Sequence, residues 1–439
     1  MPPDRAARRT VTADARARPF RALGIRNFRQ FAAGQVISAA GTWMMVVAQD
    51  WLVLELTGNS ATALGTVTAL QFTPMLLLTL HGGRLADRYD KRALLLAANV
   101  LSGLLALLLA AFVLTGAAGP AHVQVFAFCL GLVNAVEVPT RMAFVGELVP
   151  AHLLPNASAL SAAYFSVARV AGPAAAGLLL TVLGTGGVML VNALSYLATV
   201  VALRRIRPDE LYRTARAAGR ARVTDGLRYV RGRPDLTIPF ALIAGVGLFG
   251  LNFQLTLPLL ARTVFHTDAS AFGLLTTVFA AGSLTAAFLT TTRTARPSAR
   301  LVTVSALVLG ALEATVGWAP AYPAALVLLF LTGGASVYFA QAVNHRIQLG
   351  SDPLYRGRVL ALYTLVLQGS TPLGALMVGY LAETRGARSA FVVGGLASLG
   401  TGLAALSLRA GRSGPDPAGE GPATDGPAAD DVRTGNTRP

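Results

Sequence analysis

The sequence is poor in charged residues and contains almost no cysteine or lysine. Only 13% of its 439 residues are Asp, Glu, Lys or Arg, whereas 54% are hydrophobic. So few charges cannot cover the surface of a soluble globule of this length, which excludes water as the main solvent. A single cysteine, Cys129, excludes an intramolecular disulfide. The composition therefore predicts a protein that lies mainly within a lipid bilayer.

Residue patterns that support catalysis or metal binding are also missing. The chain has no HExxH, no GxSxG and no phosphate-binding glycine loop, and its histidines are widely separated. They are His81, His122, His152, His266 and His345. The net charge of +16 is not accompanied by a nucleic-acid recognition motif. We therefore expect no enzymatic activity, no metal, no cofactor and no nucleic-acid partner.

Long apolar runs recur along the chain. A bilayer core of roughly 30 Å is crossed by about 20 apolar residues in a helix. Runs of this kind occur at 29–56, 61–83, 93–116, 121–146, 157–183, 187–204, 236–261, 269–292, 301–319, 322–344, 358–383 and 389–408. Six of them precede a polar stretch and six follow it. We therefore predict an all-α membrane protein whose twelve transmembrane helices form two six-helix bundles.

The runs divide the chain into five segments. These are an N-terminal tail (1–28), a first bundle (29–204), a central loop (205–235), a second bundle (236–408) and a C-terminal tail (409–439). The first tail is rich in Arg and lacks the apolar core of a signal peptide, so we predict a charged tail, with an organellar transit peptide as the alternative. The second tail is rich in Pro, Gly, Ala and Asp, which predicts disorder.

The positions of the basic residues predict how the helices are oriented. Arg-rich loops stay on the cytoplasmic side of a membrane. With both termini on that side, the loops on the other side hold only Arg262, Arg385 and Arg388. We therefore predict a multi-pass protein of the inner (cytoplasmic) membrane with both termini in the cytoplasm. The central loop contains VTDGLRYVRGRPDL, which is typical of a short helix on the membrane surface, with its basic side toward the headgroups; a solvated connector is the alternative.

The segment GRLADRYDKR stands between the second and third runs. A short loop needs glycine for its turn, a carboxylate can cap a helix, and guanidinium groups can pair with that carboxylate. The segment resembles GxxxDRxGRK, the cytoplasmic signature of the major facilitator superfamily, with Asp90 in place of the second glycine. The matching residues are Gly83, Asp87, Arg88, Lys91 and Arg92. The resemblance implies contacts that close the cytoplasmic side in one transport state and break in the other.

Further stretches carry the same resemblance. The fifth run contains ARVAGPAAAGLLL, in which Gly172, Pro173 and Gly177 are similar to the antiporter signature of the superfamily. Small residues let helices approach closely and proline lets a helix bend, so plain helix packing is the alternative. The stretches that begin at Glu137 and Asp352 resemble a bacterial efflux branch, which includes enterobactin-type siderophore exporters and macrolide efflux proteins.

Charged residues inside the spans are candidate functional residues, because each costs about 2.5–3.5 kcal/mol at the bilayer midplane. They are Asp50, Glu137, Arg141, Arg169 and Glu313. Glu137 and Arg141 are four residues apart on one helix face, and we predict that Arg169 completes a network with them. Asp50 is predicted to bind a proton, because burial favours the neutral carboxyl group. The alternative for Asp50 is a helix-end residue near Gln49 and Glu55, and by the resemblance Glu313 lies on a peripheral helix.

These features together predict secondary active transport. We predict proton-coupled efflux of an amphipathic small molecule, such as an antibiotic, a siderophore or another metabolite, by alternating access between the two bundles. Gln71, Asn252 and Gln254 are predicted to provide hydrogen bonds in the cavity. Uptake, lipid flipping and a non-transporting sensor are the alternatives. The expected partners are the substrate and the lipid bilayer, the expected energy source is the proton gradient, and the protein is expected to be a monomer.

Overall fold

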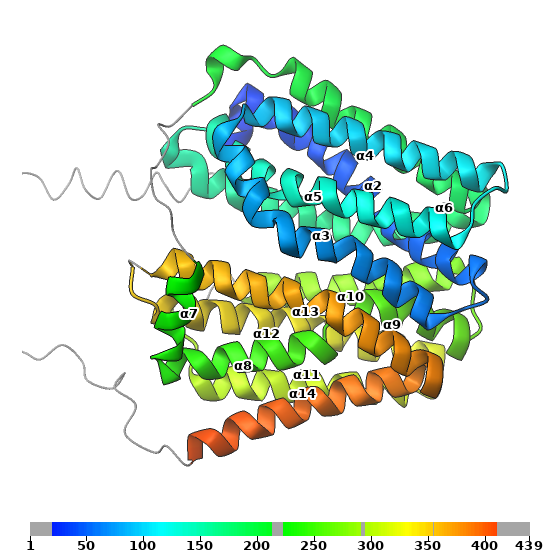
Figure 1. Cartoon of the computed structure of the whole chain (residues 1–439), viewed down its shortest axis with the longest axis vertical. Helices are drawn as coiled ribbons and strands as arrows, with labels where there is room; N and C mark the ends of the chain where they lie inside the picture. Colours follow the sequence, from blue (N-terminus) through cyan, green and yellow to red (C-terminus); the bar gives the residue numbers. More distant parts are fainter. Residues whose placement is uncertain (1–19, 213–222, 291–294, 354, 411–439) are drawn as a thin grey trace, which may run out of the picture.

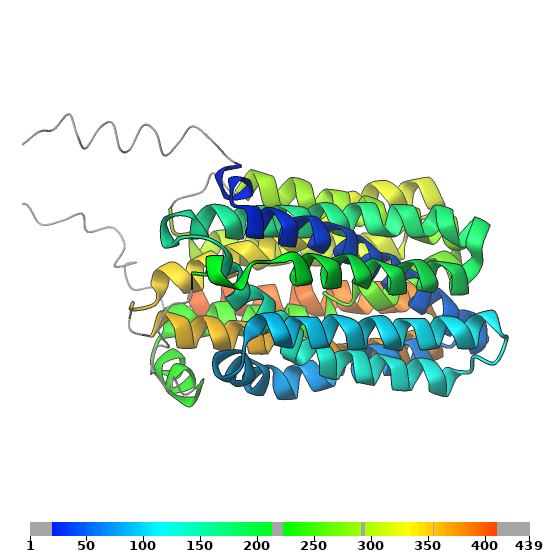
Figure 2. The same ribbon diagram turned by 90° about the horizontal axis from the view of Figure 1, so that it is seen from above.

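The computed structural model describes residues 20–212, 223–290, 295–353 and 355–410. Every regular element in this part of the chain is a helix. The predicted disorder of the C-terminal tail concerns residues that lie outside the described part, as does most of the N-terminal tail. Figures 1 and 2 show the helices running roughly parallel to one another, so that the connecting loops gather at two opposite ends.

The first bundle is built from five α-helices and two short helical turns. After the short turn η1 (Arg21–Gly24) come α2 (Arg26–Leu56), α3 (Ala61–Arg88), α4 (Lys91–Leu114), α5 (Pro120–Leu148), the turn η2 (Ala151–Leu153) and α6 (Leu154–Arg205). Side chains set two of the helix starts, since Ser60 accepts a hydrogen bond from Ala63 N and Asp90 accepts one from Ala93 N.

The long element α6 contains two membrane spans. Gly184 has φ 67° and ψ 178°, a conformation that glycine adopts readily and that ends a helix. Leu154, at the start of α6, lies beside Gly146, whereas Gly186 packs against Leu114 at the opposite end of the bundle. The chain therefore crosses the bundle before Gly184 and returns after it.

The second bundle follows a short connecting segment. This segment contains the turn η3 (Pro208–Glu210) and the helix α7 (Val223–Arg231). The bundle consists of α8 (Pro234–Phe249), α9 (Phe253–Leu259), the π-helical turn η4 (Leu260–Val264), α10 (Ala269–Thr290), α11 (Ala299–Gly317), α12 (Tyr322–Gly350), α13 (Arg356–Arg385) and α14 (Ala387–Ala410). The elements α8, α9 and η4 together form one span, Pro234–Val264.

These elements confirm the predicted twelve-helix architecture. Eleven helical segments of the described chain are long and apolar enough to cross a membrane, and one of them is the 55-residue segment that turns at Gly184. Counting that segment as two spans gives twelve. The predicted spans begin and end within a few residues of the observed helices, and Figure 1 shows the first bundle above the second.

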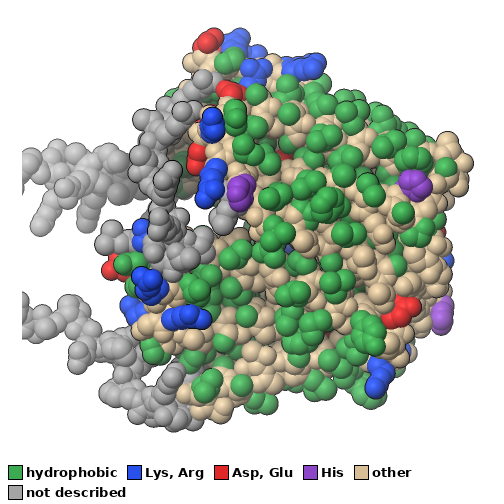
Figure 3. All heavy atoms as spheres, in the orientation of Figure 1, with side chains coloured by type: hydrophobic (Ala, Val, Ile, Leu, Met, Phe, Trp, Pro, Cys, Tyr) green, Lys and Arg blue, Asp and Glu red, His purple; other side chains and the backbone are tan. Residues whose placement is uncertain are grey.

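The outer surface is suited to lipid. Large apolar side chains in the middle of several helices are exposed, for example Leu104 at 57%, Leu373 at 60% and Leu396 at 57%. In Figure 3 the charged side chains gather mainly at two opposite edges, with hydrophobic side chains in the band between them. The edge that holds Arg88, Arg205 and both ends of the described chain is called the arginine-rich end below. The opposite edge is called the arginine-poor end.

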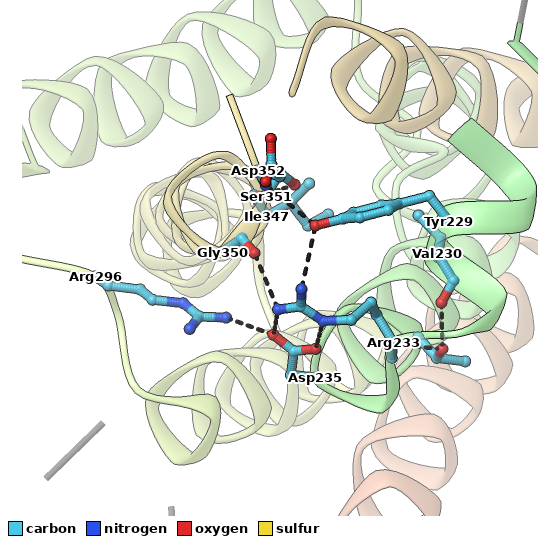
Figure 4. Close-up of polar contacts among 10 residues, drawn as sticks. Tyr229, Val230, Arg233, Asp235, Arg296, Ile347, Gly350, Ser351 and Asp352 are labelled. Atoms are coloured by element: carbon cyan, nitrogen blue, oxygen red, sulfur yellow. Dashed lines mark hydrogen bonds and ion pairs between the residues drawn. The ribbon is translucent and has the colours of Figure 1, made fainter. Parts of the chain in front are cut away.

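The helix α7 packs on the second bundle rather than standing apart as a connector. The rings of Tyr229 and Tyr355 are stacked with centroids 4.5 Å apart, and Val230 is buried. Figure 4 shows Arg233 donating hydrogen bonds to Asp235 at 2.9 and 3.1 Å, and Arg296 donating to the same carboxylate at 3.1 Å. The bonds to Asp235 raise the pKa of Arg233 above its ordinary value. These contacts fix α7 to the arginine-rich end of the second bundle.

Candidate functional site

A cavity of about 320 Å³ lies between the two bundles. The first bundle contributes residues of α2, α3 and α6, and the second contributes α9, α10, α12, α13 and the break between α8 and α9. Most of the wall is apolar and aromatic. The charged and amide-bearing residues on it are Asp50, Arg169, Asn252 and Gln254. A mainly apolar wall with a few fixed polar groups is the usual form of a small-molecule site.

The break in the seventh span forms part of this wall. The backbone hydrogen-bond ladder of α8 ends with Gly250 N donating to Val246 O at 2.7 Å, and bonding resumes with Leu255 N donating to Asn252 O at 3.0 Å. Asn252 Nδ2 donates to Leu248 O at 2.8 Å, which satisfies one carbonyl freed by the break. The unwound turn places Asn252 and Gln254 on the cavity wall.

Asp50 is the buried carboxylate of the cavity. Its side chain is 2% exposed, and its Oδ2 atom has no hydrogen-bond partner among the described residues. An unpaired carboxylate ion is costly in a low-dielectric interior, and binding a proton removes this cost. Asp50 therefore remains the candidate for the proton-binding carboxyl group that the sequence predicts.

Arg169 is the cation of the same cavity. Its guanidinium lies over the ring of Trp43, 5.3 Å from the centroid, and its side chain is accessible from the cavity. Within the described chain it forms no ion pair, because no carboxylate oxygen lies within 4.0 Å of its guanidinium. Asp50 and Arg169 thus share the cavity without neutralising each other.

A second pocket of about 220 Å³ lies within the first bundle and holds the Glu137–Arg141 pair. Arg141 Nε donates to Glu137 Oε1 at 2.9 Å, and its guanidinium lies 4.2 Å from the ring centroid of Phe165. The expected three-residue network with Arg169 is wrong. Arg169 lines the main cavity instead. Trp43 lies between the two sites, because it lines both the main cavity and the second pocket.

Gln71 lies in this second pocket, not in the main cavity. It accepts a hydrogen bond from Gln49 Nε2 at 3.3 Å. Glu313 also lies outside the main cavity. Its side chain is only 3% exposed, although its helix was expected to be peripheral. Of the three predicted cavity amides, Asn252 and Gln254 reach the site and Gln71 does not.

The arginine-poor end of the cavity is closed by contacts between the bundles. Trp51 stacks on Phe272 across the interface, with centroids 6.1 Å apart. Arg262 Nε donates to Asn59 Oδ1 at 3.1 Å, and its guanidinium lies 4.6 Å from the Trp51 centroid. Glu383 accepts hydrogen bonds from Ser60 Oγ and Thr62 N, each 3.1 Å long. These are the only hydrogen bonds that join the two bundles within the described residues.

Glycines allow the bundles to meet closely at this end. A Cβ atom on Gly273 of α10 would lie 2.7 Å from Gly177 Cα and 2.8 Å from Pro173 O of α6. Gly172, one residue before that proline, packs instead on α2, where a Cβ would lie 2.5 Å from Trp43 Cβ. The segment of α6 that contains Gly172, Pro173 and Gly177 therefore serves two interfaces, one inside the first bundle and one between the bundles.

At the arginine-rich end, the motif residues lie differently from the prediction. Gly83, Asp87 and Arg88 belong to the last turns of α3 and not to a loop, so Gly83 forms no turn. The capping carboxylate is Asp90, which begins α4. Asp87 is exposed and makes no hydrogen bond or ion pair with a described residue.

The two basic residues that follow bind within the first bundle. Lys91 Nζ forms an ion pair with Glu147 at 2.7 Å, which joins α4 to α5. Arg92 donates to Leu203 O at 2.7 Å and to Arg204 O at 3.0 Å, at the C-terminal end of α6. Such cations stabilise a helix C-terminus. These contacts brace one end of the first bundle and leave the other bundle untouched.

Sequence reasoning missed the break between α8 and α9 and the Trp51–Phe272 contact. The segment GLNFQLTLPL held a signal for the break, because Gly250 and Asn252 both have weak helix preference and Pro258 follows. The Trp51–Phe272 contact left no signal, since it joins residues far apart in the chain.

Comparison with known proteins identifies relatives along most of the chain. The family model described as "Transmembrane secretion effector" matches residues 17–415. The multidrug efflux pump Tap of Mycolicibacterium fortuitum is 25% identical over 386 residues, which cover 84% of this chain and 93% of the pump. The Tap pump of Mycobacterium tuberculosis is 26% identical, with 85% and 91% covered. The staphyloferrin A transporter of Staphylococcus aureus is 27% identical, with 56% and 62% covered.

Solved structures share the fold at lower identity. A bacterial homologue of the human lysosomal transporter Spinster, in an inward-facing and unoccupied conformation, superposes with a TM-score of 0.67 at 14% identity and covers 88% of this chain and 95% of its own. A bacterial homologue of the iron transporter ferroportin, in an inward-facing state, has the same TM-score and identity, with 87% and 98% covered.

Proposed function

Because the chain belongs to the transmembrane secretion effector family of the major facilitator superfamily, we propose that it exports an amphipathic small molecule in exchange for protons. The observation that carries the proposal is the cavity between the bundles, where an apolar wall surrounds the buried and unpaired carboxyl group of Asp50. An apolar wall suits an amphipathic ligand. A carboxyl group that exchanges a proton suits coupling to a proton gradient.

The arginine-rich end is assigned to the cytoplasm, because basic loops resist translocation. With this assignment, we propose an inner-membrane protein with both described chain ends on the cytoplasmic side. Within the described residues, the hydrogen bonds that join the two bundles lie at the opposite end, which supports an inward-facing state. Each molecule holds a complete cavity between its own bundles, and we propose that it acts as a monomer.

The cycle follows from this arrangement. Substrate enters from the cytoplasm and lies against the aromatic wall, while the proton on Asp50 leaves to the cytoplasm. The bundles then rock about the cavity, which separates the Trp51–Phe272 contact and opens the outer end. Outside, a proton binds Asp50 and substrate leaves. The relative called a multidrug efflux pump supports the outward direction, and the relative called a staphyloferrin A transporter supports a small-molecule cargo.

The direct test is an accumulation assay in a bacterium that lacks its own major efflux pumps. Cells that produce the protein are loaded with a panel of antibiotics, dyes and siderophores, with and without a protonophore. We expect lower accumulation of at least one compound, and we expect the protonophore to remove the difference. Proteoliposomes that move this compound equally well without a proton gradient would disprove the antiport mechanism, and inward accumulation would indicate uptake.

The orientation is tested by thiol labelling. In a Cys129→Ala background, single cysteines replace Ala117, in the loop after α4, or Asp209, in η3; both positions are exposed. We expect a membrane-impermeant maleimide to label Ala117→Cys in intact cells and Asp209→Cys only after permeabilisation. The reverse pattern would show that the arginine-rich end faces outward.

A further inference from the structure

A second buried carboxyl group lies outside the cavity. Glu313 of α11 is 3% exposed, and its Oε2 atom has no hydrogen-bond partner among the described residues. Ser398 of α14 is fully buried, and its Oγ atom also has no partner. Two unsatisfied polar side chains in the same buried region are unusual, because buried polar groups are nearly always hydrogen-bonded.

These groups converge on the back of the break between α8 and α9. A Cβ atom on Gly250 would lie 2.8 Å from Glu313 Oε2 and would collide with Ser398 Oγ. A Cβ on Gly394 would lie 2.5 Å from Glu313 Oε1 and 2.8 Å from Phe249 O. The two glycines thus make room for the carboxyl group against the last residues of α8, a space that any larger residue would fill.

The environment of Glu313 disfavours its charged form. The C-terminal carbonyls of a helix carry partial negative charge, so the end of α8 repels a carboxylate ion. None of the described basic side chains lies within 4.0 Å of it. The charged or titratable residues on the helices packed against α11 lie near helix ends or line another pocket. Among the residues whose side chains the structure describes, they are Asp235, Tyr322, Tyr338, His345, Arg346 and Arg388.

The hydrogen bonds of Arg388 explain why this cation does not reach Glu313. Arg388, at the start of α14, donates to Gly317 O at 3.1 Å and to Ala319 O at 3.0 Å, which holds it over the end of α11. Glu313 lies one turn before Gly317. A neutral acid, by contrast, gains an O–H donor that can bond a carbonyl at the end of α8 or Ser398 Oγ.

We propose that Glu313 is a second proton-binding site, placed behind the α8–α9 break, which takes up and releases a proton reversibly. The front of the break carries Asn252 and Gln254 on the cavity wall. When Glu313 is protonated, its O–H group donates a hydrogen bond that holds the back of the break. When the proton is released to water, the remaining carboxylate is repelled by the carbonyl groups at the end of α8. Proton occupancy therefore biases the shape of the cavity wall. The link to transport rests on the proposed proton-coupled function, but the binding of the proton does not.

The test is infrared difference spectroscopy of the purified full-length protein, titrated from acidic to alkaline pH. Protonated carboxyl groups give a C=O band that disappears when the proton leaves. We expect the wild type to show reversible bands from two buried carboxyl groups. Glu313→Gln should lose one band and Asp50→Asn should lose the other. A Glu313 band that does not change with pH would show a permanently neutral structural group and would overturn the proposal.

Two further variants keep the test decisive. If Glu313→Gln does not fold, Ser398→Ala keeps the carboxyl group and removes its hydroxyl neighbour, and we expect a shift in both the frequency and the pH midpoint of one band; unchanged spectra would contradict the proposal. Asp209→Asn, at an exposed position, should leave both bands intact. Because no substrate is used, transport that ignores a proton gradient would disprove the proposed antiport and leave this result standing.

Discussion

Replacing Asp50 with asparagine is expected to abolish proton-driven accumulation of substrate while the protein still folds and reaches the membrane. One proton that crosses a gradient of one pH unit supplies about 1.4 kcal/mol, enough to sustain a roughly tenfold substrate gradient. An amide cannot carry the proton, so this gradient should fall to unity in Asp50→Asn. Asparagine keeps the size of the side chain and carries no charge at any pH, so the variant retains the shape of the cavity wall.

The measurement uses proteoliposomes with an imposed pH gradient, loaded with a compound identified in the accumulation assay. Exchange of labelled for unlabelled compound without a gradient should persist in Asp50→Asn, because the cavity is retained. The matched control is Asp209→Asn, which makes the same chemical change on an exposed residue of η3 and should transport like the wild type. Full gradient-driven accumulation in Asp50→Asn would remove Asp50 from the mechanism.

Replacing Gly273 with leucine is expected to hold the arginine-poor end open. The atoms that a side chain would meet are the backbone of Gly177 and Pro173, which cannot rotate away. Overpacking of this kind costs about 1–3 kcal/mol. Such a cost shifts the equilibrium between the two states of the transporter by roughly 5- to 150-fold. We therefore expect transport to fall by roughly fivefold or more, because the closed outer end forms less often.

Accessibility to thiol reagents reports the shift directly. A cysteine in place of Thr276, on the cavity wall, should react faster with an impermeant maleimide added from outside when Gly273 is leucine. The control is Gly400→Leu, since nothing lies within 4 Å of a Cβ at that exposed position of α14. Equal labelling rates in both variants would mean that the contact of α6 with α10 does not govern the outer end.

The membrane spans were predictable because hydropathy follows directly from residue type. Apolar runs report which segments can leave water, and the twelve expected runs match the helices closely, including the two separated by Gly184. Family membership also confirms that the chain is a transporter and not an enzyme. These properties depend on local composition and on residue order, both of which one sequence contains.

Helix ends in the polar regions were less predictable. The motif segment was interpreted as a loop because it contains glycine and many charges, but α3 continues to Arg88. A helix that leaves the bilayer stays helical in water when its residues have adequate helix preference, and charged residues do. Asp90, the residue that departs from the superfamily pattern, is the one that caps α4.

The charged residues show the limit of sequence reasoning most clearly. Asp50 and Glu313 are both isolated carboxylates in apolar helices, yet only Asp50 lines the cavity between the bundles. Which face of a helix meets which neighbour depends on packing between segments far apart in the chain. For the same reason Arg169 could not be separated in advance from Glu137 and Arg141, although Trp43 stands between their chambers.

The attachment of α7 limits how far the transporter can open toward the cytoplasm. Tyr212 N is bonded to Glu147 O at 2.8 Å and so moves with the first bundle, whereas α7 moves with the second. Only residues 213–222 are left to bridge them. A fully extended chain spans at most about 3.6 Å per residue, so the attachment points can separate by no more than roughly 40 Å. The covalent connection through residues 213–222 therefore sets an upper limit on the distance between the two bundles at the arginine-rich end.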